Sequence, residues 1–490
     1  MKHSYRFDNK KFNSEELRLY INSNKKLSLL YNNLQKTLTE KYKHVIYSSS
    51  TNCAKIICGM LELLGFYSCY DKDHKSQMKQ DSKCYAYLTI NNVYGKVLSK
   101  SLIKGIKKTF NDRPDNIFGD NIRIIIIDKY FKEGIDLFDV KYMHIFSKII
   151  YENEENQIIG RIKRSCGHIG LPNGTKQIIY SYFPGEKSDI SFGKELTKLC
   201  YYSSIDYFEV QDIQDLLFGN YIKSLKNNFT LNNGITSDIL EFKGTLFDKY
   251  ENIYSNNRSN CYGKFELTPT QLMIKDYFQP SLDIKGILCW HYVGSGKTCL
   301  GLGVARNFID KKYSVIWVSR NSLLKDIQKN LSVCYEKDKI DKKLLVITYK
   351  TFTNLLQNKN KYARDNLSNT LIIIDEAHKL FDGSLSKLEA PNLEILKEAI
   401  KHKTCKVMLM TATPFIQEPM QLIKLLNLIV ETKMSEDFEE FAKEYLESDK
   451  LLFSYKGANL FVKNIYKNIS YLDMSKDNAK FAIQIKNDVI

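Results

Sequence analysis

Short apolar runs alternate along the chain with stretches in which apolar residues recur at a helical period. The run Ile124–Ile127 is apolar at every position, as expected for a strand buried on both faces of a parallel sheet. In the first half, the pattern predicts helices at Ser14–Tyr42 and Ala54–Leu64 and strands at His44–Tyr47, Ala86–Ile90 and Ile122–Ile127. In the second half, it predicts strands at Gly286–Trp290, Ser314–Ser319, Leu344–Thr348, Leu371–Ile374 and Lys406–Met410. Such alternation is typical of the α/β class, and we expect two mostly parallel sheets with flanking helices.

Between these two α/β regions the pattern weakens. A helix is predicted at Gly193–Phe218, and the Asn- and Ser-rich stretch Asn252–Asn260 is typical of a linker. Further helices are predicted after the last strand, at Pro419–Val430 and Ser435–Leu446. The chain is therefore expected to contain a first lobe, a helical connector with a linker, a second lobe and a helical tail, at residues 1–188, 189–262, 263–432 and 433–490.

Composition narrows the class of protein only moderately. With 490 residues, 43% of them hydrophobic, the chain can bury two or three globular cores. A net charge of +16 favours binding to phosphate backbones, although a basic proteome without a nucleic-acid role would give the same value. The 11 cysteines include no CxxC pair, which disfavours a zinc site and indicates a reducing compartment. Neither an apolar signal segment nor a membrane-spanning run is visible.

The sequence GSGKT follows a predicted strand and opens a predicted helix. A glycine loop in this position points backbone N–H groups at phosphate oxygens, and the helix N-terminus adds its dipole. Lys297 would then reach the β- and γ-phosphates, and Thr298 would hold Mg²⁺. His291 stands where the usual pattern has glycine or alanine, and a turn that binds nothing is the alternative. The residues expected to bind nucleotide here are Gly294, Ser295, Gly296, Lys297, Thr298 and Cys299.

Two further predicted strands end in polar residues. The first runs into DEAH, at the edge where open α/β sheets bind ligands. Asp375 would hold Mg²⁺ through water, and Glu376 would orient or deprotonate the attacking water. The second strand ends in TAT, and the hydroxyls of Thr411 and Thr413 would couple the nucleotide site to the other lobe. A Ser/Thr turn before a proline is the alternative for this triplet.

Together, the phrases LTPTQLMIKDYF, KGILCWHYVGSGKTC, LIIIDEAHKL and VMLMTATPF resemble the first lobe of superfamily 2 helicases and translocases. They look most like the helicase-like ATPase group of large cytoplasmic DNA viruses, which includes the poxvirus early transcription factor small subunit and nucleoside triphosphatase I. The resemblance implies two RecA-like lobes, ATP and Mg²⁺ as ligands, and adenine recognition by Phe265 and Gln271. The residues that it places on the nucleic-acid backbone are Ser319, Arg320, Thr348 and Tyr349.

The first half of the chain looks like the second lobe of the same enzymes, on the strength of FKEGID and QIIGRIKR. The resemblance implies that Gly134 and Asp136 approach the ribose and that Gln157 binds the nucleotide. It also implies an arginine-finger helix, from which Arg161 and Arg164 would neutralise charge on the γ-phosphate. Two arginines three residues apart on a helix are otherwise typical of a solvated face.

The two lobes therefore occur in the reverse of the usual order. We expect a permuted but complete motor, a nucleic-acid-dependent ATPase that acts as a helicase, translocase or remodeller in viral transcription. Its partners would be DNA or RNA and viral RNA polymerase or transcription factors, with no membrane, in a cytoplasmic viral factory or the virion. The alternatives are one section of a tandem protein, half-sites completed by self-association, a non-catalytic scaffold of a viral transcription or packaging assembly, and a P-loop enzyme acting on a small molecule.

Overall fold

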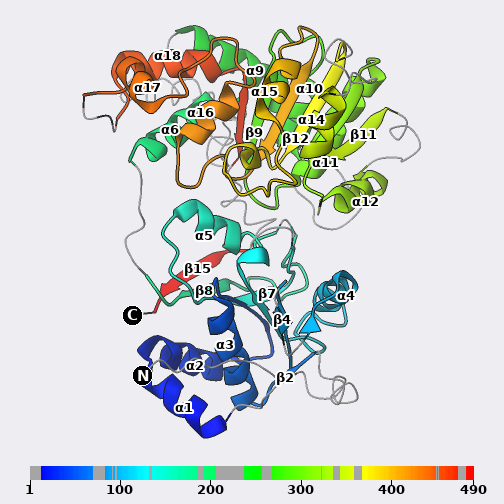
Figure 1. Ribbon diagram of the computed structural model, residues 1–490. Helices are drawn as coiled ribbons and strands as arrows, with labels where there is room; N and C mark the ends of the chain where they lie inside the picture. Colours follow the sequence, from blue (N-terminus) through cyan, green and yellow to red (C-terminus); the bar gives the residue numbers. More distant parts are fainter. Residues whose placement is uncertain are drawn as a thin grey trace. The chain divides into compact units, whose positions relative to one another are not determined.

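The computed structural model describes residues 13–69, 83–90, 92–93, 96–131, 135–164, 166–184, 191–205, 237–256, 267–321, 323–334, 343–357, 367–448, 450, 452–472 and 482–489. The chain forms two compact units, residues 1–188 with 478–490 and residues 189–477. Each unit contains one large parallel sheet with helices packed against it (Figure 1). The predicted α/β class with two parallel sheets is therefore confirmed.

The first unit is built on a seven-stranded sheet with the order β15-β8-β7-β1-β6-β3-β2. Every pairing between these strands is parallel. The strands are β1 (Lys43–Tyr47), β2 (Tyr67–Ser68), β3 (Cys84–Leu88), β6 (Ile124–Ile127), β7 (Val140–Ile145), β8 (Gln177–Ser181) and β15 (Gln484–Asp488), beside a hairpin of β4 (Asn92–Val93) and β5 (Lys96–Val97). The helices are α1 (Ser14–Ser23), α2 (Lys25–Thr37), α3 (Thr51–Leu63), η3 (Lys129–Phe131), α4 (Lys100–Phe110) and α5 (Glu152–Ile159).

Strand β6 shows why an unbroken apolar run is needed here. Ile124 and Ile126 belong to the core on one side of the sheet, whereas Ile125 and Ile127 belong to the core on the other side. Because both faces are covered by helices, no position of the strand reaches water.

The single helix predicted at Ser14–Tyr42 is in fact two helices. The backbone of Asn24 is extended (φ −110°, ψ 106°), and its side chain accepts a hydrogen bond from the N–H of Leu27. Asparagine at this position ends α1 and caps the N-terminus of α2, because its short amide competes with the helical hydrogen bonds. The prediction was wrong here because the apolar period continues across the break.

The second unit is built on a six-stranded parallel sheet with the order β11-β10-β12-β13-β9-β14. Its strands are β9 (Gly286–His291), β10 (Ser314–Ser319), β11 (Leu344–Thr348), β12 (Thr370–Asp375), β13 (Lys406–Thr411) and β14 (Ile469–Leu472). Its helices are α6 (Ser191–Ser203), α9 (Ser237–Asn256), α10 (Pro269–Tyr277), α11 (Lys297–Asp310), α12 (Leu324–Cys334), α14 (Tyr349–Gln357), η5 (Ala377–Leu380), α15 (Leu393–Ile400), α16 (Met420–Leu426), α17 (Phe438–Tyr445) and α18 (Tyr455–Ile465).

The connector and the tail differ from the predicted pattern. Helix α6 ends at Ser203, and residues 206–236 lie outside the described part of the chain. Helix α9 extends to Asn256 and so includes the start of the stretch predicted as a linker. The tail predicted as helical also contains β14 and β15, and β15 pairs with β8 of the first unit. Both strands are short and pair with distant segments, which a local pattern does not reveal.

Cys69 and Cys84 are joined by a disulfide, with their Cα atoms 5.7 Å apart. The pairing of β2 with β3 brings them together, since the N–H of Cys69 donates to the carbonyl of Tyr85 over 2.9 Å. The structure differs at this point from the reduced cysteines that the sequence indicated. Cys53, Cys200 and Cys405 carry free thiols. Every helix in the described part of the chain is too short or too polar to span a membrane.

A pair of histidines is buried in the sheet of the first unit. His44 Nδ1 lies 3.3 Å from His144 Nε2, and His144 Nδ1 lies 2.9 Å from the hydroxyl of Tyr182. Burial lowers the pKa of His144 to about 3, and burial together with His144 lowers the pKa of His44 well below its ordinary value. Both rings are therefore neutral in the folded protein at neutral pH.

Acidification is expected to destabilise this unit. Since the unfolded chain binds protons at an ordinary histidine pKa and the folded chain does not, stability is lost as pH falls below about 6.5, and for His144 the loss reaches roughly 2 kcal/mol at pH 5. Urea unfolding of His44→Gln at pH 7 and pH 5 should show a smaller acid-induced loss than the wild type. The control is His402→Gln, at a partly exposed histidine of the second unit, and an equal effect of the two variants would contradict the assignment.

Candidate functional site

The glycine loop, residues 292–296, connects the end of β9 to the start of α11. Gly294 and Gly296 have φ values of 85° and 78°, in the left-handed region that favours glycine. Gly296 caps the N-terminus of α11, and a Cβ atom on it would lie 2.7 Å from Gln271 Nε2. The loop therefore needs glycine at both positions, and it leaves the first N–H groups of α11 available to an anion.

Gln271 holds the glycine loop from one side. Its Nε2 donates to the carbonyls of Ser295 and Gly296, each over 3.1 Å. Its Oε1 accepts from the N–H of Thr268 over 2.9 Å, in a capping box at the start of α10. In this structure the amide thus supports the loop, whereas the resemblance implied that it reads adenine. Phe265, the other residue expected to read adenine, lies outside the described residues.

Two polar groups of the loop region fit a phosphate ligand. The Ser295 hydroxyl is buried without a hydrogen-bond partner. Lys297 Nζ folds back on the loop and donates to the carbonyls of His291 and Tyr292 over 3.1 Å and 3.2 Å. Phosphate oxygens would provide acceptors for both groups. Thr298 and Cys299 follow in the first turn of α11 and are both half-buried.

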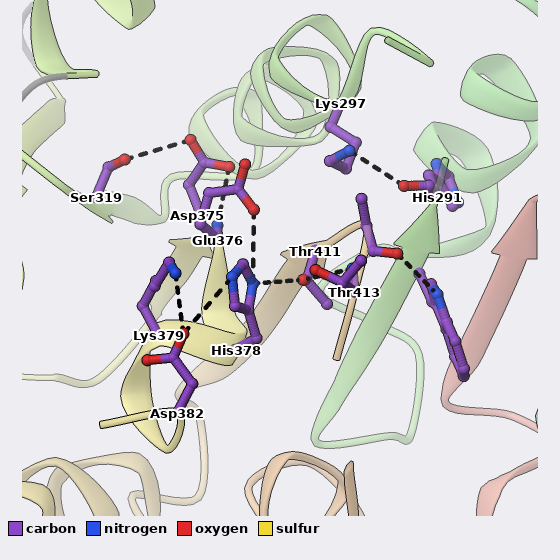
Figure 2. Close-up of polar contacts among 12 residues, drawn as sticks. His291, Lys297, Ser319, Asp375, Glu376, His378, Lys379, Asp382, Thr411 and Thr413 are labelled. Carbon is purple, nitrogen blue, oxygen red and sulfur yellow. Dashed lines mark hydrogen bonds and ion pairs between the residues drawn. The ribbon is translucent and has the colours of Figure 1, made fainter. Parts of the chain in front are cut away.

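The acidic turn, residues 375–378, follows directly from β12. Asp375 Oδ2 accepts from the hydroxyl of Ser319 over 3.3 Å, and its Oδ1 accepts from the N–H of Glu376 over 3.1 Å. Glu376 has left-handed backbone angles (φ 52°, ψ 48°), and its side chain is 27% exposed. The turn therefore presents one buried and one accessible carboxylate side by side (Figure 2).

His378 connects this turn to the threonines at the end of β13. Its Nδ1 lies 2.8 Å from Thr411 Oγ1 and 3.6 Å from Glu376 Oε2. Thr411 Oγ1 also accepts from the N–H of Thr413 over 3.1 Å. Both threonines are buried, and Figure 2 shows the chain of contacts from the glutamate through the imidazole to the threonines. These contacts join the acidic turn to the end of β13.

The register of the sheet brings these segments together. Asp375 pairs with Met410 across β12 and β13, and Thr411 pairs with Trp290 across β13 and β9. The glycine loop, the acidic turn and the threonine pair thus leave one edge of one sheet, at the carboxyl ends of three adjacent strands. This is the edge at which open α/β sheets bind ligands.

Burial dominates the electrostatics of the site. It raises the pKa of Asp375 to about 7, with a further contribution from Glu376, while Lys297 opposes the shift. A bound cation would reverse this shift, since it favours the ionised carboxylate. His291 is also buried, with Nε2 2.6 Å from Ser470 Oγ, and burial and then Lys297 lower its pKa to about 3. His291 is therefore a neutral support of the loop.

The structure corrects part of the predicted nucleic-acid contacts. Ser319 and Tyr349 are 0% and 2% exposed, and their hydroxyls point to the acidic turn instead of to a surface. Thr348 bonds to Thr351 and caps α14, and Arg320 is half-buried beyond β10. Sequence reasoning missed the support that Ser319 and Tyr349 give to the acidic turn, because a hydroxyl at the end of a strand can face either way.

In the first unit, both arginines contact the loop that carries Asp136. Arg161 is buried, and its guanidinium donates to the carbonyls of Gln157 and Ile135 over 3.1 Å and 3.3 Å. Arg164 donates to the carbonyl of Ile135 over 3.0 Å and forms an ion pair with Asp136.

The predicted arginine-finger helix is wrong in one respect, because α5 ends at Ile159 and both arginines lie in the turns that follow. Gly160 is the C-cap, and its N–H closes the last turn onto the carbonyl of Asn156. Gln157 is buried within α5, and Gly134 lies outside the described residues.

Part of the second unit matches a known protein family. Residues 264–416 match the family model of the type III restriction enzyme res subunit. This stretch contains the glycine loop, the acidic turn and the threonine pair. This part of the second unit is therefore similar to the res subunit family.

Individual relatives of this chain include proteins of large DNA viruses and of a yeast plasmid. A protein of Acanthamoeba polyphaga mimivirus that bears the name of an ATP-dependent RNA helicase is 27% identical over 238 residues, 42% of this chain and 39% of its own length. A killer plasmid helicase of Kluyveromyces lactis is 30% identical over 176 residues, 35% of this chain and 28% of its own length. The early transcription factor 70 kDa subunit of rabbit fibroma virus is 26% identical over 217 residues, 42% of this chain and 33% of its own length.

These relatives confirm the resemblance to helicase-like proteins of large DNA viruses. The alignments cover well under half the length of each relative. Among solved structures, the SWI2/SNF2 ATPase core of Sulfolobus solfataricus in complex with dsDNA aligns with a TM-score of 0.32 and 16% identity, over 46% of this chain and 45% of that chain. At this score the structural likeness carries no argument.

Replacement of the buried carboxylate tests the electrostatics of the site. A raised pKa in the folded state means that Asp375 favours folding below about pH 4 and that this contribution is lost as pH rises through about 7. Asp375→Asn should therefore be more stable than the wild type at pH 8, by roughly 1–3 kcal/mol, and the gain should vanish near pH 5. Urea unfolding without nucleotide or divalent cations measures this difference.

Asp382→Asn is the matched control with the opposite sign. Burial favours a higher pKa for Asp382, but Lys379, 2.9 Å away, and Ser384 outweigh burial and hold the pKa below its ordinary value. This variant should lose stability at pH 8. Two variants that shift stability in the same direction would contradict the account of Asp375.

Proposed function

We propose that this protein is a nucleic-acid-dependent ATPase of the superfamily 2 type, which acts as a helicase, translocase or remodeller in viral transcription. The observation that carries the proposal is the arrangement at one sheet edge of a glycine loop, the Lys297 amino group and the adjacent carboxylates of Asp375 and Glu376. Lys297 follows β9 and Asp375 ends β12, at the same edge of the sheet, and the charge of Lys297 favours the ionised form of Asp375, which supports a shared site. The proposed substrate is ATP, and the proposed location is a viral factory or the virion.

The residues of this site suit hydrolysis of a phosphoanhydride. The glycine loop and Lys297 would hold the phosphates, and the Ser295 hydroxyl would gain an acceptor there. Thr298 and Asp375 offer the oxygen ligands that Mg²⁺ prefers, and the ion would neutralise phosphate charge. Glu376, more exposed than Asp375, would orient the attacking water and accept its proton.

The first unit would contribute an arginine. Both arginines donate to the carbonyl of Ile135, but Arg164 is the better candidate, because its other partner is the 54% exposed carboxylate of Asp136, whereas Arg161 is itself buried. We therefore propose Arg164 as the residue that stabilises charge on the γ-phosphate and Arg161 as the support of its loop. Nucleic acid would bind mainly through its phosphates, in keeping with the net charge of +16.

Replacement of Lys297 should remove ATP hydrolysis. Lys297→Ala takes away the only amino group seated on the glycine loop in the described part of the chain, and we expect a fall in kcat of at least roughly 100-fold. The assay measures phosphate release with and without single-stranded DNA, duplex DNA and RNA. Lys311→Ala, at the exposed end of the same helix, is the control and should keep wild-type turnover.

The nucleic acid that stimulates turnover identifies the polymer on which the enzyme acts. Turnover that no nucleic acid changes would favour an enzyme acting on a small molecule. A wild-type protein that binds ATP but does not hydrolyse it under any condition would contradict the proposal and favour the scaffold alternative.

Replacement of Arg164 tests the role of the first unit. Arg164→Ala should retain ATP binding and lose roughly 10³-fold in kcat, since a missing arginine finger removes charge stabilisation late in the reaction. Lys176→Ala, at an exposed lysine of the same unit, is the control. Unchanged turnover in Arg164→Ala would remove the finger assignment.

Mixing two inactive variants shows how the units combine. If the arginine acts within one molecule, a mixture of Arg164→Ala and Lys297→Ala stays inactive. If it acts between molecules, the mixture recovers part of the wild-type turnover. Either result decides between a permuted motor and half-sites completed by self-association.

A further inference from the structure

The backbone at Glu376 adopts a conformation that needs support. Its φ of 52° and ψ of 48° lie in the left-handed region, where the Cβ atom crowds the following carbonyl. Asparagine and glycine tolerate this region, but glutamate has no side-chain group that stabilises it locally. The surrounding structure must therefore hold the acidic turn in place.

Tyr349 provides such support. Its hydroxyl contacts the carbonyl of Asp375 and lies 3.2 Å from the carbonyl of Glu376. These two carbonyls belong to the peptide groups on either side of the Glu376 Cα atom. Because φ and ψ of Glu376 describe the orientation of those two peptide groups, one hydroxyl near both oxygens restrains both angles.

The tyrosine itself is fixed by the core of the second unit. It is the first residue of α14 and is 2% exposed, and it packs in the same cluster as Phe352, Ile374 and Ala377. Burial, and next the nearby Asp375, raise the pKa of its hydroxyl well above the ordinary value, so the hydroxyl remains a donor at every pH at which the protein works. The core thus holds the ring of Tyr349 in place, and its hydroxyl oxygen reaches the acidic turn.

Other contacts leave the orientation of Glu376 incompletely fixed. The Glu376 carbonyl accepts from the N–H of Lys379 over 2.9 Å, which fixes the peptide after Glu376. The Glu376 N–H donates to the carboxylate of Asp375, a group that must also serve a cation in the proposed function. Tyr349 is independent of that carboxylate and would retain its hold when Asp375 changes partners.

We propose that Tyr349 is a positioning residue for ATP hydrolysis, whose hydroxyl holds the backbone of Glu376 so that the Glu376 carboxylate is aimed at the attacking water. This inference rests on the proposed function. It replaces the nucleic-acid contact that the sequence suggested for Tyr349. The tyrosine does not touch the substrate, so its effect should appear in the rate of the chemical step and not in nucleotide binding.

Tyr349→Phe in the full chain tests this inference, because it keeps the ring and removes the hydroxyl. We expect kcat for ATP hydrolysis to fall by roughly 10- to 100-fold, with the Kd for ATP within about twofold of the wild type, because small displacements of a catalytic group lower turnover without weakening binding. Tyr277→Phe is the matched control. Tyr277 is also buried in the second unit, and its hydroxyl donates over 2.9 Å to a backbone carbonyl, that of Lys467, which precedes β14.

Repeating the substitution in the Glu376→Gln variant distinguishes a positioning role of Tyr349 from a general loss of structure. If Tyr349 acts through Glu376, then Tyr349→Phe should have no further effect on the residual turnover of Glu376→Gln. An equal fall in both backgrounds, or a wild-type kcat in Tyr349→Phe, would overturn the inference. So would a fall in kcat that Tyr277→Phe matches.

The two proposals can fail separately. A wild-type protein without ATPase activity refutes the proposed function and this inference with it. An active wild type whose Tyr349→Phe variant retains full kcat refutes the inference alone.

Discussion

The parallel pairing of β12 with β13, and of β13 with β9, is the constraint on which the candidate site depends. Asp375 lies beside Met410 and Thr411 beside Trp290, so three loops leave the sheet at the same edge and at matching heights. A slip of one residue in either pairing would turn the alternate side chains of a strand to the opposite core. Strands β12 and β13 divide their apolar side chains between two hydrophobic clusters, with Ile372 and Leu409 on one face and Ile373 and Met408 on the other.

That geometry requires a carboxylate to lie where water has little access. Burial, and next the neighbouring carboxylate of Glu376, raise the pKa of Asp375, although Asp375 accepts hydrogen bonds from a hydroxyl and one backbone N–H. An isolated buried carboxylate is unfavourable, and the usual compensation is a cation or a proton. In the proposed function, the same burial that makes an ionised Asp375 unfavourable without ligands would favour a cation beside it. Such shifted groups in a cleft are typical of functional sites, although structural ion pairs produce them as well.

The sequence predicted strands well, because a strand depends on the pattern of neighbouring residues. Ser314–Ser319 and Leu344–Thr348 have the predicted bounds, because each is a short β-rich run that ends at a polar residue. The break at Asn24 went unseen because the apolar period continues through it. The directions of the Ser319 and Tyr349 hydroxyls depend on packing between distant segments. So do the pairings of β14 with β9 and of β15 with β8. Burial of Arg161 was hidden for the same reason, since its acceptors include a carbonyl 26 positions away in the sequence.

The order of the segments along the chain has a physical consequence in the first sheet. Strand β15 comes after the whole second unit in sequence, yet it forms the edge next to β8. Lys486 of β15 pairs with Glu155 of α5 over 2.9 Å, and Gln484 bonds to Gln177, whose amide also contacts the carbonyl of Ile162 in the arginine-bearing turns. The segment that would supply the arginine is therefore braced by residues encoded at the opposite end of the chain. The seven-stranded sheet of the first unit can therefore be completed only after the residues of β15, which follow the second unit in the sequence, have been synthesised.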